Sequence, residues 1–233
     1  MPNSVLPIGT ATWILESEHR THGGVVIGGT GSGKTCLVTT LAHQVIDTAA
    51  GGVWYAAAVG REVPELAQRV DWGACGTDGC LEILRAAGGT VASHRPGTHH
   101  RLMVILDDAD VLFRCSRAAT EVAEYIARCG PQTGVALVVT TRSPLLDSFG
   151  SSSGLRDNLF DGNTVLLRSR TRWSGKVAGL DADLSRLPRF GAGYTRSPGQ
   201  RHYSRFTWQP TGPAASGRHT AAAGTGEQHG GRA

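Results

Sequence analysis

The stretch GGTGSGKT, Gly28 to Thr35, decides how the rest of the chain is interpreted. It fits the pattern G-x-x-x-x-G-K-[ST], in which a glycine-rich loop joins a buried strand to a helix. A short apolar run begins at Val25, and from Lys34 on, apolar residues recur at helical spacing until Gly51. Such a loop aims successive backbone N–H groups and the positive end of the helix at one point. The sequence therefore predicts a phosphate cradle.

The cradle supplies separate groups for phosphate and for a cation. Its backbone N–H groups would surround the β-phosphate of ATP, and glycines let the backbone approach that closely. Lys34 would neutralise oxygens of the β- and γ-phosphates as part of the catalytic machinery, and the hydroxyl of Thr35 would ligate Mg²⁺. The residues expected to bind the nucleotide are consecutive: Gly28, Gly29, Thr30, Gly31, Ser32, Gly33, Lys34, Thr35 and Cys36.

A second apolar run ends in two acidic residues. Leu102 to Leu106 has the length of a strand and leads directly into Asp107 and Asp108. A phosphate cradle needs such a strand to hold the magnesium ion, so Asp107 is the predicted acidic ligand of the metal shell. Asp108 is the predicted catalytic carboxylate, which orients and polarises the attacking water. The alternative is a helix cap or a turn built on aspartates, which is common at strand ends.

Short, continuous apolar runs recur along the chain. They are Val25 to Gly28, Val53 to Val59, Leu102 to Leu106, Val135 to Val139 and Thr164 to Leu167. Runs that do not alternate are typical of strands buried on both faces, and helical patterns lie between them. One of these patterns, Ala119 to Ala127, is expected to end before Gly130 and Pro131. The predicted fold class is α/β, with a mainly parallel central sheet between two layers of helices.

Length and composition fit one domain of ordinary size. The chain has 233 residues, 40% of them hydrophobic, and residues 1–210 are the predicted ATPase domain. From Thr211 on, large apolar residues are almost absent, which predicts a disordered tail over residues 211–233. No apolar run approaches the roughly 20 residues of a membrane-spanning helix. The start of the chain also lacks a basic signal, so we expect a cytoplasmic protein without a membrane segment of its own.

Charge is distributed unevenly along the chain. Residues 1–161 carry 12 basic and 16 acidic side chains, whereas residues 162–233 carry 11 and 3. The basic third is the candidate surface for a polyanion, and a solvated arginine-rich surface is the alternative. Arg114 and Arg117 follow the paired aspartates and are candidate contacts for DNA phosphates, with solvated loop arginines as the equal alternative. Arg201 to Trp208 interleaves basic and aromatic residues, and an edge strand packed on the core is the preferred interpretation.

Four stretches resemble the FtsK/SpoIIIE/HerA group of DNA-translocating ATPases, in particular short actinobacterial forms associated with plasmid transfer. They are GGTGSGKT, the apolar run with Asp107-Asp108, Gly134 to Pro144, and Phe149 to Leu180. The resemblance covers roughly residues 5 to 208. It implies a RecA-like P-loop NTPase core of the ASCE type and ATP hydrolysis coupled to movement along double-stranded DNA. It also implies a homo-oligomeric ring, usually a hexamer.

Two positions depart from the pattern of this group. The group has Asp-Glu where this chain has Asp107-Asp108, and the shorter side chain predicts weakened hydrolysis with intact ATP binding. The strand-end Ala-Thr-Gln of the group appears as Thr140-Thr141-Arg142, which leaves Thr141 as the expected sensor of the γ-phosphate. In such rings an arginine of the neighbouring subunit completes the site. The candidates for that arginine are Arg156, Arg168, Arg170 and Arg172.

Three further signals are interpreted as structural. Gly150 to Gly154 fits the G-x-S-x-G pattern of a nucleophile elbow, but no strand leads into it. His94, His99 and His100 lack cysteine or acidic neighbours at ligand spacing, so loop histidines are expected rather than a metal site. Trp54 and Tyr55 are expected in the core or at its rim.

The leading hypothesis is an ATP-driven motor core that translocates double-stranded DNA in plasmid conjugal transfer or chromosome partition. One alternative is a non-catalytic or weakly active ATP-binding ring or adaptor subunit, to which Asp108 and Arg142 point. Another is a protein-secretion ATPase, because such motor cores share both motifs. The third is a P-loop kinase for a small molecule, in which Arg168, Arg170 and Arg172 would clamp a phosphate.

Overall fold

An eight-stranded sheet lies at the centre of the computed structural model, which describes residues 4–59, 64–95 and 101–209. The strand order is β11-β10-β9-β4-β8-β7-β5-β6. The strands from β9 to β6 are parallel, and β10 and β11 extend the sheet antiparallel. The strands are β4 (Gly24–Ile27), β5 (Gly52–Ala57), β6 (Trp72–Cys75), β7 (Leu102–Asp107), β8 (Val135–Thr141), β9 (Asn163–Leu166), β10 (Ala192–Arg196) and β11 (Ser204–Thr207).

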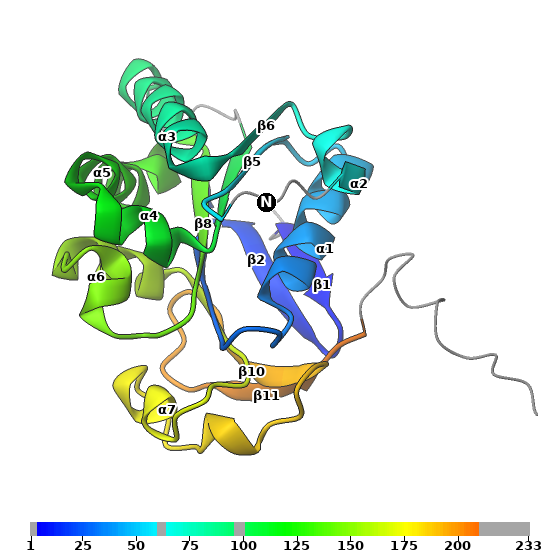
Figure 1. The fold of residues 1–233 in the computed structure, drawn as a ribbon. Coiled ribbons are helices and arrows are strands. Elements are labelled where there is room, and N and C mark those ends of the chain that lie inside the picture. The colour runs from blue at the N-terminus through cyan, green and yellow to red at the C-terminus, as the bar shows by residue number, and fades with distance from the viewer. Residues whose placement is uncertain (1–3, 60–63, 96–100, 210–233) are drawn as a thin grey trace, which may run out of the picture.

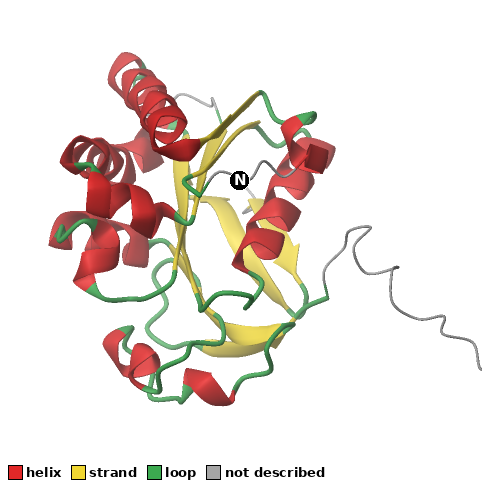
Figure 2. Cartoon of the chain, in the orientation of Figure 1, coloured by secondary structure: helices red, strands yellow, loops and turns green. Residues whose placement is uncertain are grey.

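Helices cover both faces of this sheet (Figure 1 and Figure 2). One face carries α3, α4, α5 and α6, and the other carries α1 and the short α2. The helices are α1 (Lys34–Asp47), α2 (Pro64–Ala67), α3 (Gly76–Ser93), α4 (Ala109–Cys115), α5 (Arg117–Thr133), α6 (Ser153–Asp161) and α7 (Trp173–Val177). Two 3₁₀ turns, η1 (Leu146–Phe149) and η2 (Leu184–Arg186), lie in the connections.

Two hydrophobic cores lie on the opposite faces of the sheet because side chains alternate along each strand. Val25 and Ile27 of β4 pack in the core under α3–α6, whereas Val26 packs in the core under α1. In β7, Val104 belongs to the first core and Ile105 to the second. The expected α/β fold, with a mainly parallel sheet between two layers of helices, is confirmed.

A small antiparallel sheet at the N-terminus was not predicted. It consists of β1 (Ser4–Ile8), β2 (Ala11–Ser17) and β3 (Arg20–Thr21). Its inward side chains, including the fully buried Trp13, pack in the core beside α1. The buried amide of Asn163 joins it to the main sheet by accepting from Ile14 N at 2.9 Å and donating to Ile14 O at 2.8 Å.

The expected end of the second helical pattern was wrong. α5 continues through Gly130 and Pro131 to Thr133. Pro131 lies in the last turn, where its missing N–H removes one intrahelical hydrogen bond and leaves the turn otherwise intact. The helix instead ends at Gly134, which adopts a left-handed conformation with φ 84° and donates its N–H to Gly130 O.

The C-terminal part of the described chain forms one edge of the sheet. β11 is an edge strand whose Phe206 is buried, and Trp208 directly after it is buried too, so the edge-strand interpretation of Arg201 to Trp208 is confirmed. The predicted tail over residues 211–233 lies outside the described residues. Among the described residues, no helix combines the length and the hydropathy that crossing a bilayer requires.

Candidate functional site

The glycine loop follows β4 and is anchored on both sides by backbone hydrogen bonds. Gly28 N donates to Thr141 O of β8 at 3.1 Å, and Gly29 N donates to Arg168 O at 2.8 Å. Gly28 has no room for a side chain, because a Cβ there would lie 2.4 Å from Ser32 Oγ. Gly33 has φ 98°, a left-handed conformation that favours glycine. The sequence pattern therefore folds into the tight loop that it predicts.

The N-terminal end of α1 points its unpaired N–H groups toward this loop. Gly33 is the N-cap, and within the described residues no side chain caps the helix. Free N–H groups and the helix dipole together favour an anion at this end. The buried Ser32 Oγ also finds no hydrogen-bond partner in the described part of the chain. These unsatisfied donors fit a bound phosphate, which would accept hydrogen bonds from them.

The two halves of the predicted site meet at one cavity. Lys34, whose side chain is 6% exposed, places its Nζ 3.7 Å from Asp108 Oδ1. Both residues line a cavity of about 510 Å³, a size within the range of small-molecule sites. The other residues that line it are Thr30, Gly31, Gly33, Thr35, Cys36, Val59, Arg142 and Phe190. The structure thus brings the glycine loop and the paired aspartates together, as the sequence predicted.

Asp107 lies at the centre of a hydrogen-bond network. Thr35 Oγ1 donates to Asp107 Oδ2 at 2.6 Å, and Tyr55 OH donates to the same oxygen at 3.2 Å. Thr140 Oγ1 donates to Asp107 Oδ1 at 2.5 Å, and the backbone N of Asp108 also contacts that oxygen at 3.1 Å. Four donors, one of them the hydroxyl of Thr35, therefore hold the Asp107 carboxylate in place.

The Thr35 hydroxyl and the Asp107 carboxylate fit a magnesium site. Both are oxygen ligands, which Mg²⁺ prefers, and they are already adjacent. No cluster of three histidine, cysteine or acidic side chains that could hold a metal occurs within residues 4–59, 64–95 and 101–209. A magnesium ion here would therefore take most of its shell from phosphate oxygens and water, as Mg²⁺ does in nucleotide sites.

Tyr55 and Thr140 are site residues that the sequence interpretation missed. Burial, and then the neighbouring charge of Asp107, raise the pKa of Tyr55, so its hydroxyl stays protonated and donates to that carboxylate. Trp54, the other aromatic residue of β5, packs edge-on against Trp72. The expectation that Trp54 and Tyr55 lie in the core or at its rim is confirmed, since Tyr55 is buried and Trp54 is partly buried against the core. The pairing register of β5 and β8 with β7 places Tyr55 and Thr140 beside Asp107. No local sequence motif predicts this arrangement.

The predicted γ-phosphate sensor has a local hydrogen bond. Thr141 is fully buried, and its hydroxyl donates to Ser143 O at 3.1 Å. The preceding Thr140 is the threonine whose hydroxyl contacts Asp107, because successive residues of a strand point to opposite faces. The sensor role of Thr141 stays a prediction.

Asp108 is held in an unusual backbone conformation. Its φ of 50° and ψ of 38° are left-handed, and it is the N-cap of α4. Among residues other than glycine, asparagine and aspartate adopt this conformation most readily. Its backbone N donates to Thr140 Oγ1 at 2.8 Å, and its side chain is 31% exposed in the cavity. Asp108 therefore holds the N-cap position of α4 without a capping hydrogen bond from its side chain, and its carboxylate faces Lys34 instead.

Arg142 contacts two carboxylates at the same cavity. Its Nε lies 4.0 Å from Asp108 Oδ1 and 3.7 Å from Asp110 Oδ2. Asp110 is buried, and this burial raises its pKa, while the charges of Arg142 and Arg114 act in the opposite direction. Arg114 adds an ion pair to Asp110 at 3.2 Å. The cation that stands where the resembling group has glutamine therefore lies beside Asp108, the carboxylate predicted to activate water.

Three arginines surround the outer side of the glycine loop. Arg168, Arg170 and Arg189 line a separate cavity of about 450 Å³ together with Gly29 and Ser32. Arg168 and Arg170 are two of the four candidates for an arginine that acts on a neighbouring subunit, and the structure places them beside the loop of their own chain. The sequence interpretation missed Arg189.

The other two candidate arginines contact groups elsewhere. Arg156 donates to the carbonyl oxygens of Pro144 and Val177, and the guanidinium of Arg172 lies over the Trp173 ring. An arginine supplied by a neighbouring subunit stays a prediction.

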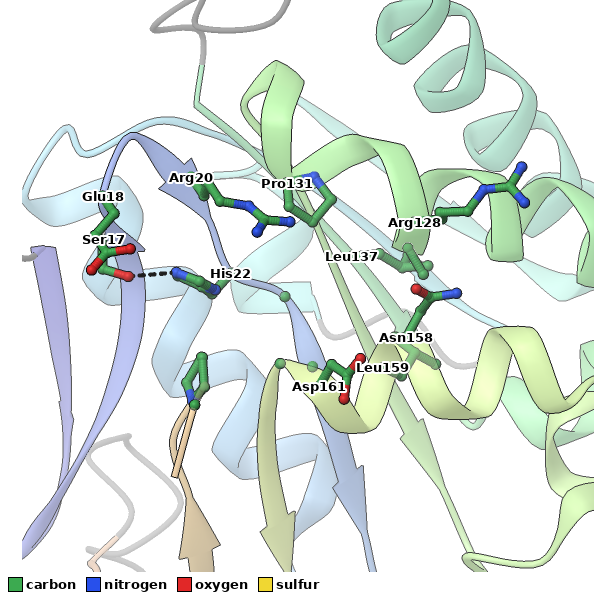
Figure 3. Close-up of a pocket in the computed structure, with 16 residues that line it drawn as sticks. Ser17, Glu18, Arg20, His22, Arg128, Pro131, Leu137, Asn158, Leu159 and Asp161 are labelled. Atoms are coloured by element: carbon green, nitrogen blue, oxygen red, sulfur yellow. Dashed lines mark hydrogen bonds between the residues drawn. The ribbon is translucent and has the colours of Figure 1, made fainter. Parts of the chain in front are cut away.

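A further cavity lies at the opposite end of the parallel strands (Figure 3). Gly23 and Gly24 at the start of β4 line it, whereas the glycine loop follows the end of that strand. Ser17 Oγ contacts His22 Nε2 at 2.7 Å in its wall, and Arg20 and Asp161 also line it. This cavity is remote from the paired aspartates, so it does not take part in the phosphate site.

The motif Gly150 to Gly154 lies in a structural setting, whereas the interpretation of the three histidines stays a prediction. The 3₁₀ turn η1, rather than a strand, leads into Gly150. Ser152 caps α6 by accepting from Leu155 N at 2.9 Å, and it donates to Glu124. His94 Nδ1 hydrogen bonds to Thr90 O, and His99 and His100 lie outside the described residues.

Comparison with known proteins identifies the fold. No protein-family model and no curated protein matches the sequence. The cytoplasmic domain of the Thermomonospora curvata type VII secretion ATPase EccC matches with a TM-score of 0.67 and 20% identity, over 88% of this chain. The pCW3 conjugation coupling protein TcpA with ATPγS matches with a TM-score of 0.67 and 13% identity, over 92% of this chain. The fold is that of a P-loop ATPase domain.

Smaller proteins share this P-loop fold as well. The genome packaging NTPase B204 from Sulfolobus turreted icosahedral virus 2, in complex with AMPPCP, matches with a TM-score of 0.54 and 12% identity. The match covers 81% of this chain and 98% of that one. By contrast, this chain spans only 28% of the EccC chain and 68% of the TcpA chain. The expected P-loop ATPase fold is confirmed, and membership of the FtsK/SpoIIIE/HerA group and its plasmid-transfer form stay predictions.

Proposed function

We propose that the chain is an ATP-hydrolysing motor core that translocates double-stranded DNA. One observation carries the nucleotide chemistry: the Thr35 hydroxyl contacts the Asp107 carboxylate while Lys34 faces Asp108 across the same cavity. These residues come from two motifs more than 70 positions apart in the sequence, and their meeting at one cavity supports a nucleotide site. A glycine turn without function would not require an acidic pair across the sheet.

The residues would divide the work of hydrolysis. The loop backbone, the end of α1 and Lys34 would bind the phosphates, and Thr35 and Asp107 would hold the magnesium ion. That ion neutralises charge developing on the phosphate oxygens. Asp108 would orient the attacking water and accept its proton. Tyr55 and Thr140 would hold Asp107 in position without contacting the substrate.

The DNA substrate is proposed from charge and from the structural neighbours, and the ring from the resemblance to the FtsK/SpoIIIE/HerA group alone. Residues 162–209 carry nine basic and two acidic side chains, and Arg117, paired only with the exposed Glu121 in the described contacts, has a side chain that is 92% exposed. Arginines on such a surface bind phosphates without reading bases. Two neighbours are named as a conjugation coupling protein and a genome packaging NTPase. EccC is named as a secretion ATPase, so protein cargo is the competing assignment.

The ion pair between Arg142 and Asp108 favours a second candidate function. Arg142 Nε lies 4.0 Å from Asp108 Oδ1, so a water that approaches this oxygen would compete with the guanidinium. Weak or absent hydrolysis would make the chain an ATP-binding ring or adaptor subunit. Its nucleotide site would then control assembly rather than movement.

One assay separates these functions. Phosphate release from ATP is measured with and without duplex DNA, for the intact chain and for Lys34→Ala. The motor predicts turnover that duplex DNA stimulates, that falls with added salt and that Lys34→Ala abolishes. Saturable ATP binding without turnover would favour the adaptor. Turnover that DNA leaves unchanged would contradict a DNA motor, and a phosphorylated small-molecule product would identify a kinase.

A further inference from the structure

The segment between η2 and β10 crosses directly over the glycine loop. A Cβ on Gly31 would lie 3.3 Å from Arg189 Nη2, and a Cβ on Gly33 would lie 2.7 Å from Phe190 Cε2. Gly191 follows with φ 81° and turns the chain into β10. Two consecutive side chains of this segment therefore contact the loop that is predicted to hold the phosphates.

Phe190 combines support on one side with exposure on the other. Its ring lies 5.0 Å from the ring of Trp208 at an angle of 44°, and Trp208 is buried. Phe190 itself is 41% exposed and lines the phosphate cavity with Cys36 and Val59. A large apolar ring that is held in place on one side and partly exposed in the cavity on the other has an unused face.

We propose that Phe190 is the surface on which the base of the bound nucleotide stacks. This inference rests on the proposed nucleotide site. Lys34 and Asp108 define the end of the cavity that takes the β- and γ-phosphates. The nucleoside must then extend past the start of α1, where Cys36 and Phe190 form the rest of the wall. Stacking on an aromatic ring accounts for a loss of about 5- to 100-fold in affinity when the ring is removed.

The cavity wall also determines how selective this contact is. Every base has a π-face, so stacking alone accepts purines of either kind. Apart from Asp108, which faces Lys34, no described residue that lines the cavity carries a side-chain amide or carboxylate that could read the hydrogen-bonding edge of a base. ATP and GTP should therefore bind with affinities within about tenfold of each other, because neither edge is read.

The experiment compares a nucleotide with its phosphates alone. Affinities for ATPγS and for inorganic tripolyphosphate, both with magnesium, are measured for the intact chain, Phe190→Ala and Phe190→Tyr. Phe190→Ala should lose about 5- to 100-fold in affinity for ATPγS and keep its affinity for tripolyphosphate within twofold. Phe190→Tyr, which retains the ring, should bind both ligands as the intact chain does.

A matched control and two contrary results complete the test. Trp173→Ala removes another exposed aromatic ring, 56% exposed and under Arg172 and Lys176, and should change neither affinity. Equal losses of affinity for both ligands in Phe190→Ala would show that the ring only supports the loop. An unchanged affinity for ATPγS would show that the base does not stack on the ring. Either result overturns the proposal. An intact chain that binds neither ligand, or Lys34→Ala binding like the intact chain, would instead overturn the nucleotide site itself.

Discussion

The guanidinium of Arg142 lies 4.0 Å from the carboxylate of Asp108, at the position from which a water would be activated. The same guanidinium contacts the buried Asp110 at 3.7 Å. The side chain of Arg142 is 44% exposed, so solvent screens its attraction to Asp108. Such an ion pair contributes at most about 1 kcal/mol. The contact would weaken the proposed hydrolysis without moving the residues proposed to bind the phosphates.

Replacing Arg142 by glutamine is expected to raise ATP turnover about two- to fivefold. The change releases Asp108 from a contact of at most about 1 kcal/mol, which corresponds to that factor in rate. Steady-state phosphate release at saturating ATP measures the effect. A fall in kcat would instead identify Arg142 as a residue that stabilises the transferring phosphate.

Lengthening the catalytic carboxylate is expected to maintain or raise turnover. Asp108→Glu restores the side chain that the resembling group has, and it brings the carboxylate closer to the cavity. Its left-handed backbone favours aspartate over glutamate, so the variant should also unfold at a slightly lower temperature. Turnover and thermal unfolding are measured together. A large loss of turnover in a folded Asp108→Glu chain would contradict the role assigned to this position.

Replacing Asp107 by asparagine should separate nucleotide binding from catalysis. The amide would present its NH₂ to donors that now meet a carboxylate oxygen, which costs about 1–3 kcal/mol of stability. Magnesium-dependent turnover should fall about 100-fold or more, while ATP still binds through the loop.

The control for Asp107 is Tyr55→Phe. This variant removes one donor to the carboxylate, at 3.2 Å, and should cost about 0.5–1.5 kcal/mol with turnover retained within a few-fold. Unchanged magnesium dependence in Asp107→Asn would show that the ion is held elsewhere.

His22, in the wall of the cavity at the opposite end of the parallel strands, should make stability depend on pH. Burial, and then the charge of Arg20, lower the pKa of His22 below its ordinary value of 6.5. A histidine with a lowered pKa stabilises the fold above pH 6.5, and this contribution is lost as the pH falls through its folded pKa. The free energy of unfolding should therefore drop less between pH 7 and pH 5 in His22→Gln than in the intact chain. Identical pH profiles would contradict this.

The strands and the phosphate loop were predictable because their signals are local. Buried parallel strands appear in the sequence as continuous apolar runs. The glycine-loop pattern predicts a strand before it and a helix after it. The N-terminal sheet was missed although Leu6, Ile8, Trp13 and Leu15 alternate with exposed or half-buried residues, as in a strand covered on one face. The end of α5 was misplaced because proline is tolerated in a last helical turn that a left-handed glycine closes.

The contacts that complete the site could not be predicted from local patterns. Tyr55 and Thr140 reach Asp107 from two neighbouring strands, and the pairing register of parallel strands is set by packing across the whole sheet. Phe190 and Arg189 reach the loop from more than 150 residues away along the chain. No spacing rule connects residues in such a long-range contact, so only the folded chain reveals it.

The most direct test of the nucleotide site is equilibrium binding of Mg²⁺-ATPγS to the intact chain and to Lys34→Ala. Truncating a buried charge that contacts a ligand costs about 2 kcal/mol or more. We therefore expect saturable binding of Mg²⁺-ATPγS by the intact chain and an affinity at least about 30-fold lower for Lys34→Ala. Equal affinities in the two folded proteins would contradict it.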